Sequence, residues 1–316
     1  MEKKMKLARP RYFYEVTISS SPHVHSPVTT QTIMRDVLLA LLPAMAGAVY
    51  FFGLRALTVT LVSAAACVFF EYIWCALTKT PCHVHDLSAV VTGVLLAFVC
   101  PVTIPYWTIV LGDFFAIIVV KQLFGGIGDN FLNPALTARA VLLASWPALM
   151  TTHCTPFDAV TSATPLMTGE ASTMQLLLGD VPGAIGETCK VAILLGFVYL
   201  LVTQTIRWEI PVFTVAAAAL LSWALGLDPL TTVLSGGLLF GAVYMATDYV
   251  TSPLNRWAQI VYAIGIGVIV VIIRKFGAYP EGVTYAILLM NIAAPLLDRV
   301  MPQKIYGCRK ARKEAK

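Results

Sequence analysis

Residues 57–77 read LTVTLVSAAACVFFEYIWCAL, an apolar run with a single charged side chain, Glu71. At about 1.5 Å per residue, a helix of this length crosses the ~30 Å hydrocarbon core of a bilayer. Similar apolar blocks occupy 37–54, 107–120, 191–206, 212–225, 260–273 and 283–297. Buried helices of one soluble core would explain one or two such blocks but not seven. The sequence therefore predicts an all-α integral membrane protein.

The composition agrees with this prediction. Of the 316 residues, 58% are hydrophobic and only 12% are charged, whereas soluble domains are about 25% charged. The seven cysteines form no Cys-x-x-Cys pair, and several lie in apolar runs, where cysteine is usually a small buried hydrophobe. We expect no disulfide framework, no metal site and no secretory signal peptide.

The basic residues predict the orientation in the membrane. Lys and Arg cluster in 1–12 and again in 304–316, whereas 147–188 contains neither. Cytoplasmic loops are enriched in Lys and Arg, so we expect both termini in the cytoplasm, an even number of spans, and 147–188 outside. The basic residues at 79, 121, 207 and 256 then fall on the inner side, while those at 55, 274 and 275 fall outside and fit the rule less well.

The chain divides into two similar halves. In 35–146, TGVLL at 92–96 precedes a span that ends in KQLFG at 121–125; in 189–300, SGGLL at 235–239 precedes a span that ends in RKFG at 274–277. Five spans per half is an odd number, so the second copy is inverted. We expect about ten transmembrane helices in two inverted five-helix repeats with short, broken helices, an arrangement that places a site near the membrane midplane. A cytoplasmic segment (1–34), an extracytoplasmic loop (147–188) and a basic cytoplasmic tail (301–316) complete the chain.

Several ordered blocks carry a resemblance to a known family. They are SPH at 21–23, KQLFGGIG at 121–128, NFLNPA at 130–135, MATD at 245–248, TSP at 251–253, YPEGV at 279–283 and LLMN at 288–291. Together they resemble RnfD, the membrane D subunit of the Rnf electron-transport complex, and, more distantly, the B subunit of the sodium-pumping NADH:quinone oxidoreductase. The resemblance covers nearly the whole chain.

The resemblance implies a covalent flavin in the outer loop. In that family FMN is joined through its phosphate to a threonine, within a pattern that Asp158, Thr161, Ser162, Ala163 and Thr164 match in order, which makes Thr164 the acceptor. Many members have glycine where Ser162 stands. By composition alone this segment is an exposed turn. Because a threonine hydroxyl is a weak nucleophile, we expect a separate flavin transferase to form the bond.

Charged residues inside spans are costly and often functional. Glu71 and Asp113 are candidates for a Na⁺ or H⁺ path, and equally for structural pairs with a neighbouring subunit. The resemblance makes Asn130 and Asn133 candidates for lining the flavin and cation paths. The glycines at 125, 126 and 128 follow a membrane helix and no strand, so we interpret them as a tight turn and not as a nucleotide loop.

The function that the resemblance implies is electron relay through FMN in ferredoxin:NAD oxidoreduction coupled to Na⁺ or H⁺ translocation. The chain would have no complete active site of its own and would work in the cytoplasmic (inner) membrane with the A, B, C, E and G subunits of Rnf. A second, non-covalent flavin (riboflavin) between the halves stays open. So do two alternatives: the B subunit of the quinone reductase, and a channel or transporter without redox chemistry.

Overall fold

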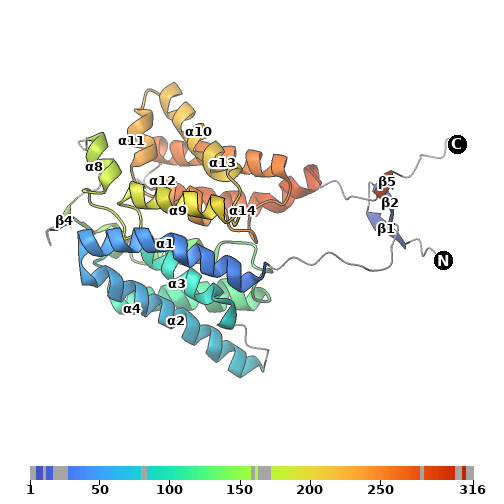
Figure 1. Cartoon of the computed structure of the whole chain (residues 1–316), viewed down its shortest axis with the longest axis horizontal. Coiled ribbons are helices and arrows are strands. Elements are labelled where there is room, and N and C mark those ends of the chain that lie inside the picture. The colour runs from blue at the N-terminus through green and yellow to red at the C-terminus, as the bar shows by residue number, and fades with distance from the viewer. Residues whose placement is uncertain are drawn as a thin grey trace.

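The computed structural model describes residues 5–9, 12–16, 28–79, 84–157, 161–162, 172–277, 281–302 and 308–310. Helices make up the body of the molecule (Figure 1). Its first half contains α1 (Thr30–Phe52), α2 (Leu54–Thr78), α3 (Ser88–Phe98), α4 (Tyr106–Phe114) with its continuation η2 (Phe115–Lys121) and η3 (Gln122–Phe124), and α5 (Pro134–Ser145). A short 3₁₀ turn, η1 (Val84–Asp86), precedes α3.

The second half repeats this order. It contains α9 (Lys190–Val202), α10 (Glu209–Ala224), a broken segment made of α11 (Pro229–Leu234), α12 (Leu238–Phe240) and η4 (Gly241–Met245), then α13 (Arg256–Phe276) and α14 (Val283–Val300). Between the halves lie α6 (Pro147–Thr151), β3 (His153–Cys154), β4 (Thr161–Ser162) and α8 (Thr173–Leu178). Strands β1 (Met5–Arg9), β2 (Tyr12–Val16) and β5 (Cys308–Lys310) form a separate antiparallel sheet.

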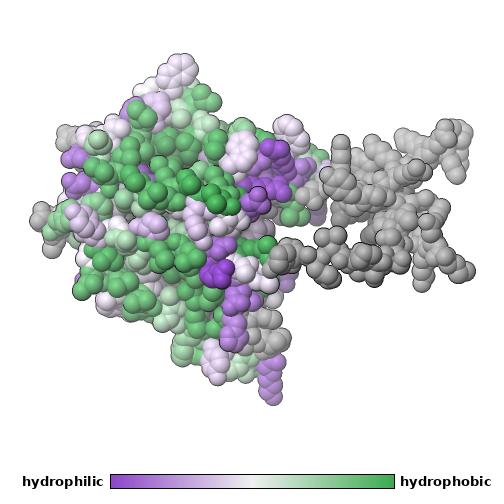
Figure 2. All heavy atoms as spheres, viewed as in Figure 1, coloured by the Kyte–Doolittle hydropathy of each residue, from purple (hydrophilic) through white to green (hydrophobic). Residues whose placement is uncertain are grey.

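Helix length and composition confirm the membrane prediction. Among the described residues, α1, α2, the continuous helix Tyr106–Phe124, α13 and α14 are long and apolar enough to cross a bilayer. Four shorter apolar helices, α3, α5, α9 and α10, join them. With the broken segment α11–η4, each half supplies five elements, in agreement with the ten that the sequence predicts. Green, apolar side chains cover much of the visible helical body in Figure 2, as expected of a surface that faces lipid.

The two halves pack in the same way. In the first, α2 packs on α3 and α4; in the second, α10 packs on α11 and α13. The halves meet where α1 lies against α9 and α5 against α14. In Figure 1 the first half, blue to green, forms one layer and the second, yellow to red, the other. The contact between the layers is therefore made by the first and last helices of each half.

Local sequence explains where the helices begin and end. Asn133 caps α5, because its side chain accepts a hydrogen bond from the backbone of Leu136, and Pro134 occupies the first turn. Asp228 caps α11 in the same way, with the backbones of Leu230 and Thr231 as donors. The apolar block at 191–206 does not form one helix over its whole length. It ends at Val202 because Gln204 adopts a left-handed φ of 57°, which a helix cannot continue through.

The strands at the two ends of the chain were not expected. Sequence patterns predict 1–34 and 301–316 only as polar, basic segments, yet β2 pairs with both β1 and β5. The N-terminal and C-terminal segments therefore lie together, beyond the end of the body at which α1 begins (Figure 1). α8 lies at the opposite end of the body.

Candidate functional site

The flavin motif lies only partly within the described residues. Thr161 and Ser162 form β4, whose backbone pairs with Cys154 and His153 of β3. Asp158, Ala163 and Thr164 lie outside the described residues. Strands β3 and β4 lie near α8, at the end of the body away from β1, β2 and β5 (Figure 1).

A network of buried charges joins the two halves. It lies at the end of the helical body that the sequence predicts to be extracytoplasmic. Arg139 of α5 pairs with Glu281, just before α14, and its Nη1 lies 3.5 Å from Oε1 of Glu187. Lys190, at the start of α9, donates hydrogen bonds to the carbonyls of Glu187 and Gly236. Side chains from both halves and the connecting loop thus meet at one place, and they hold the break between α11 and α12.

The Glu187 carboxylate lies against the backbone of Gly237. A Cβ added at Gly237 would come 2.8 Å from Cδ of Glu187, so a larger residue there would force the Glu187 carboxyl to move. This contact explains the second glycine of the SGGLL motif. In the first half, Gly93 of TGVLL matches Gly236, the first glycine of SGGLL, and a Cβ there would come 2.8 Å from Cα of Ala64 and would force α2 and α3 apart.

Burial raises the pKa of Glu187 to about 8, with the negative charge of Glu281 adding to the effect and Arg139 and Lys190 opposing it. Burial also raises the pKa of Glu281, but the positive charges of Arg139, His153 and Arg274 outweigh it, so this pKa is lowered overall. Of the two carboxyls, Glu281 is therefore the permanent counter-ion of Arg139, and Glu187 is the one that holds a proton.

This network is not predicted by the sequence as a whole, although one local signal points to it. Arg139 is a lone cation in the apolar block of α5, and such a residue inside a membrane segment is expected to have a partner. Its partners Glu187 and Glu281 lie 48 and 142 residues further along the chain. No local pattern connects them.

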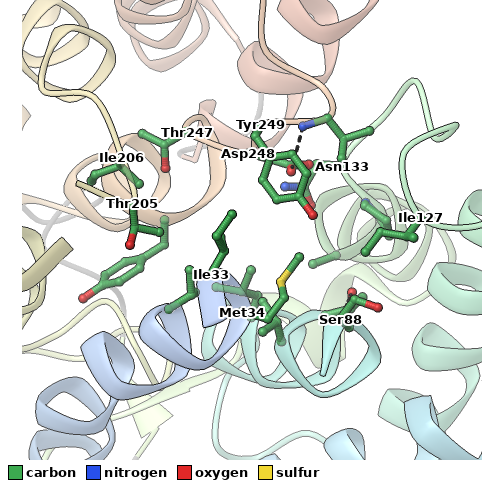
Figure 3. A pocket seen from close by; sticks show the side chains of 18 of the residues that line it. Ile33, Met34, Ser88, Ile127, Asn133, Thr205, Ile206, Thr247, Asp248 and Tyr249 are labelled. Carbon is green, nitrogen blue, oxygen red and sulfur yellow. Dashed lines mark hydrogen bonds between the residues drawn. The ribbon is translucent and has the colours of Figure 1, made fainter. Parts of the chain in front are cut away.

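A cleft of about 100 Å³ lies between the halves (Figure 3). Ile33, Met34 and Ile206 form apolar parts of its wall, and Asn133 and Asp248 add polar groups. Asn133 belongs to the first half, but its Nδ2 donates to the carbonyl of Met245 in the second, at 3.3 Å.

Asn130 also lines the cleft and donates to the carbonyl of Leu132. Asp248 accepts hydrogen bonds from the backbone of Val250 and the hydroxyl of Thr251. The structure thus brings Asn130 and Asn133, which the sequence singled out, together with Asp248, the last residue of the MATD block.

Glu71 has a partner within this chain. Its Oε1 accepts hydrogen bonds from Nζ of Lys121 at 2.7 Å and from Nε2 of Gln122 at 3.0 Å, and Lys121 also donates to Ser88. Both charged side chains are less than 5% exposed. Lys121 is therefore buried at the end of η2, whereas the sequence placed it with the loop cations. Glu71 lies two turns from the end of α2 and not at its middle.

Asp113 ties three helices of the first half together. Its Oδ1 is 2.7 Å from Oγ of Ser63 and 3.2 Å from Sγ of Cys67, both in α2. Ser63 is also 2.8 Å from the carbonyl of Gly93 in α3. Glu71 and Asp113 do not line the cleft between the halves, although Lys121, the partner of Glu71, does. Among the described residues no group of His, Cys, Asp and Glu is arranged to hold a metal ion.

Two five-helix halves, with charged residues buried at their contact, define an all-α integral membrane protein of the kind that carries a site between repeats. Residues 17–307 match the NQR2, RnfD, RnfE family, and the chain belongs to that family.

Named relatives support this family assignment. The chain is 49% identical to the D subunit of the Na⁺-translocating ferredoxin:NAD⁺ oxidoreductase complex of Acetobacterium woodii, over 95% of this chain and 98% of that protein. It is 39% identical to the D subunit of the proton-translocating ferredoxin:NAD⁺ oxidoreductase complex of Clostridium ljungdahlii, over 93% and 97%. Identity to the D subunit of the ion-translocating oxidoreductase complex of Stutzerimonas stutzeri is 37%, over 87% and 91%.

Proposed function

We propose that this chain is the flavoprotein D subunit of an ion-translocating ferredoxin:NAD⁺ oxidoreductase complex, and that it carries FMN on Thr164. The observation that carries the proposal is the order Asp158, Thr161, Ser162, Ala163, Thr164 in a chain that resembles such D subunits along almost its whole length. The relatives' names support the oxidoreductase complex over a channel or transporter without redox chemistry.

The residues around Thr164 fit a phosphoester flavin. Ser162 and Ala163 are small, and Pro165 restricts the backbone, so an external flavin transferase has room to reach the hydroxyl. When bound, FMN supplies the electron-carrying chemistry. The chain supplies the tether, which keeps the flavin close to a partner and raises its local concentration there.

We further propose that 147–188 is extracytoplasmic and both termini are cytoplasmic, in the inner membrane. The pairing of β2 with β5 supports this, because it puts both ends of the chain together. The position of α8 at the other end of the helical body supports it as well (Figure 1). The basic terminal segments would then face the cytoplasm, and the loop without Lys or Arg would face outward.

The cleft between the halves is our candidate for the second, non-covalent flavin (riboflavin). Asn130, Asn133 and Thr247 offer hydrogen-bonding groups to the polar edge of a ring system, and Ile33 and Met34 offer apolar contact to its face. The cleft, at about 100 Å³, is smaller than the roughly 300 Å³ at which small-molecule sites usually begin. Flexible side chains such as Met34 would have to turn aside for the ring to enter.

Coupling to Na⁺ or H⁺ is part of the same proposal, with Glu71, Asp113, Asn130 and Asn133 as candidates along the path. The relatives named above move different ions, so identity to them does not select one. The A, B, C, E and G subunits of Rnf are the expected partners, because this chain binds neither ferredoxin nor NAD⁺ in the proposal.

Flavin fluorescence of the denatured chain tests the central part of the proposal. When the chain is produced together with a flavin transferase, its band on a denaturing gel should fluoresce. Thr164→Val should abolish the signal, while the matched change Thr168→Val, four residues further on and outside the pattern, should leave it in place. A fluorescent Thr164→Val band would show that FMN is attached to another residue. A wild-type band without fluorescence would refute the covalent flavin.

A further inference from the structure

A second, larger cleft of about 520 Å³ opens where α1 ends and α2 begins. Its walls come from that corner, from the turn before α4 and from the chain that follows β3. Its volume lies in the range of about 300–1,000 Å³ that is usual for small-molecule sites. The cleft between the halves is smaller, and none of its lining residues is shared with this one. We call the larger one the outer cleft.

Three aromatic rings form one wall of the outer cleft. The ring centroids of Tyr50, Phe51 and Phe157 lie 5.2–5.5 Å apart, and each pair meets edge to face. Tyr50 is 70% exposed and Phe157 is 64% exposed. Burying the faces of large aromatic rings is energetically favourable. This exposed wall therefore offers contact area to a flat ring system.

The backbone holds Phe157 in place at this wall. Its N–H donates a hydrogen bond to the carbonyl of Phe51 at 3.0 Å. Its φ is 64°, a left-handed conformation that is unusual for a bulky residue. Such conformations persist where surrounding contacts enforce them, and they concentrate at ligand sites. The position of the Phe157 ring is thus fixed by the tertiary structure.

Arg55 places a positive charge at another wall of the outer cleft. The guanidinium of Arg55 donates to the carbonyl of Val102 from Nε at 3.0 Å and to that of Thr103 from Nη2 at 3.2 Å. No residue in the described ranges accepts a hydrogen bond from its Nη1. Arg55 is therefore held by two backbone carbonyls, and it keeps donor capacity for a ligand with oxygen or nitrogen acceptors.

We propose that the outer cleft holds the isoalloxazine ring of the FMN that Thr164 carries, an inference that rests on the proposed function. Cys154 lines the cleft, and its backbone pairs with Thr161. The neighbouring residues His153 and Ser162 pair as well, so β4 runs alongside β3. Thr164 follows Ser162 by two residues, which span at most about 7 Å of chain. The tether is thus short enough for its flavin to reach the cleft.

The chemistry of the cleft suits a flavin. Its aromatic wall stacks against the flat, apolar part of the ring, and Arg55 lies where it can donate to the ring's carbonyl oxygens. A fixed cation near the ring favours the negative charge that a reduced flavin carries. Arg55 therefore stabilises the reduced form, and it acts as a positioning residue for the ring.

The first test uses Cys154 as a reporter. In the flavinylated full-length protein in detergent, the ring should shield Cys154 from a maleimide, with modification read by peptide mass spectrometry. Thr164→Val removes the flavin, and Cys154 should then react several-fold faster. Cys189, also partly buried but outside the cleft, is the matched control and should react equally in both proteins. Unequal reaction at Cys189 would show a changed fold, and the second test then decides.

The second test uses flavin emission in the native, flavinylated protein. Tyrosine in contact with an excited flavin quenches its fluorescence by electron transfer, so Tyr50→Leu should raise the emission several-fold at equal flavin content. Tyr72→Leu removes a tyrosine of α2 that is 61% exposed and lies outside the outer cleft, and it should leave the emission unchanged.

The two proposals fail in different ways. A protein whose denatured band carries no flavin would remove the proposed function and this inference with it. A flavinylated protein in which Cys154 reacts as fast as in Thr164→Val, and in which Tyr50→Leu leaves the emission unchanged, would overturn the inference alone.

Discussion

Neutralising Glu71 should show whether its pair with Lys121 anchors the fold or serves the ion path. Glu71→Gln keeps the size of the side chain and can still accept from Lys121, but it removes the negative charge. Lys121 would then be a buried cation, 4% exposed, without a counter-ion. Breaking a buried pair by changing one partner typically costs about 3–5 kcal/mol, because the remaining charge stays uncompensated.

A second change tests that magnitude. Lys121→Gln should cost a similar amount alone, whereas the double variant Glu71→Gln, Lys121→Gln leaves no buried charge and should recover most of the loss. At about 2–4 °C per kcal/mol for a large domain, each single variant should unfold roughly 6–20 °C lower in detergent. The coupling energy from this double-mutant cycle should be at least about 2 kcal/mol.

Turnover separates the two roles of Glu71. If the pair is an anchor, the single variants lower the amount of assembled complex, and the remaining complex keeps its sodium-dependent or proton-dependent specific activity. The anchor role would be refuted by single variants that assemble and unfold like wild type, or by a double variant that loses the sum of both. A variant with normal yield and lost ion dependence would place Glu71 on the ion path.

Three further outcomes follow from the structure. Arg139→Gln should destabilise the protein by about 3–5 kcal/mol in thermal unfolding, because the buried Glu281 loses its permanent counter-ion, whereas Arg35→Gln at an exposed pair should cost at most about 1 kcal/mol. The stability that Glu187 contributes through its raised pKa is complete below its ordinary value of 4.5 and is lost as the pH rises through about 8. Wild-type stability should therefore fall across that window, and Glu187→Gln should flatten the fall; an unchanged slope would contradict the raised pKa. Reporter fusions after Ala171 should be active outside and fusions after Lys310 inside, and the same side for both would contradict the ten-span count.

The sequence predicts the helical elements well because each is a local pattern. The block at 57–77 lies within α2, and 283–297 lies within α14. The prediction is less accurate where a helix ends on backbone geometry. The left-handed Gln204 shortens α9. The break at SGG (235–237), which separates α11 from α12, belongs to one of the short, broken helices that the sequence predicts.

The candidate site likewise has one part that local sequence predicts and another that only the three-dimensional packing reveals. The order of residues from Asp158 to Thr164 is local, so sequence alone supports the flavin proposal. The partners of buried charges are not local, because Glu71 and Lys121 are 50 residues apart and Arg139 and Glu281 are 142 apart. Only the packing of helices brings such groups together. The strands β1, β2 and β5 depend on a pairing between the two ends of the chain, which no local pattern shows.

Mass spectrometry of the peptide that contains Thr164 tests the central claim most directly. The protein is isolated after production with a flavin transferase and digested, and the peptide is fragmented to locate any added mass. The account predicts a mass increase equal to FMN less one water, assigned to the Thr164 side chain. An unmodified Thr164 peptide, or the same mass found on another residue, would contradict it.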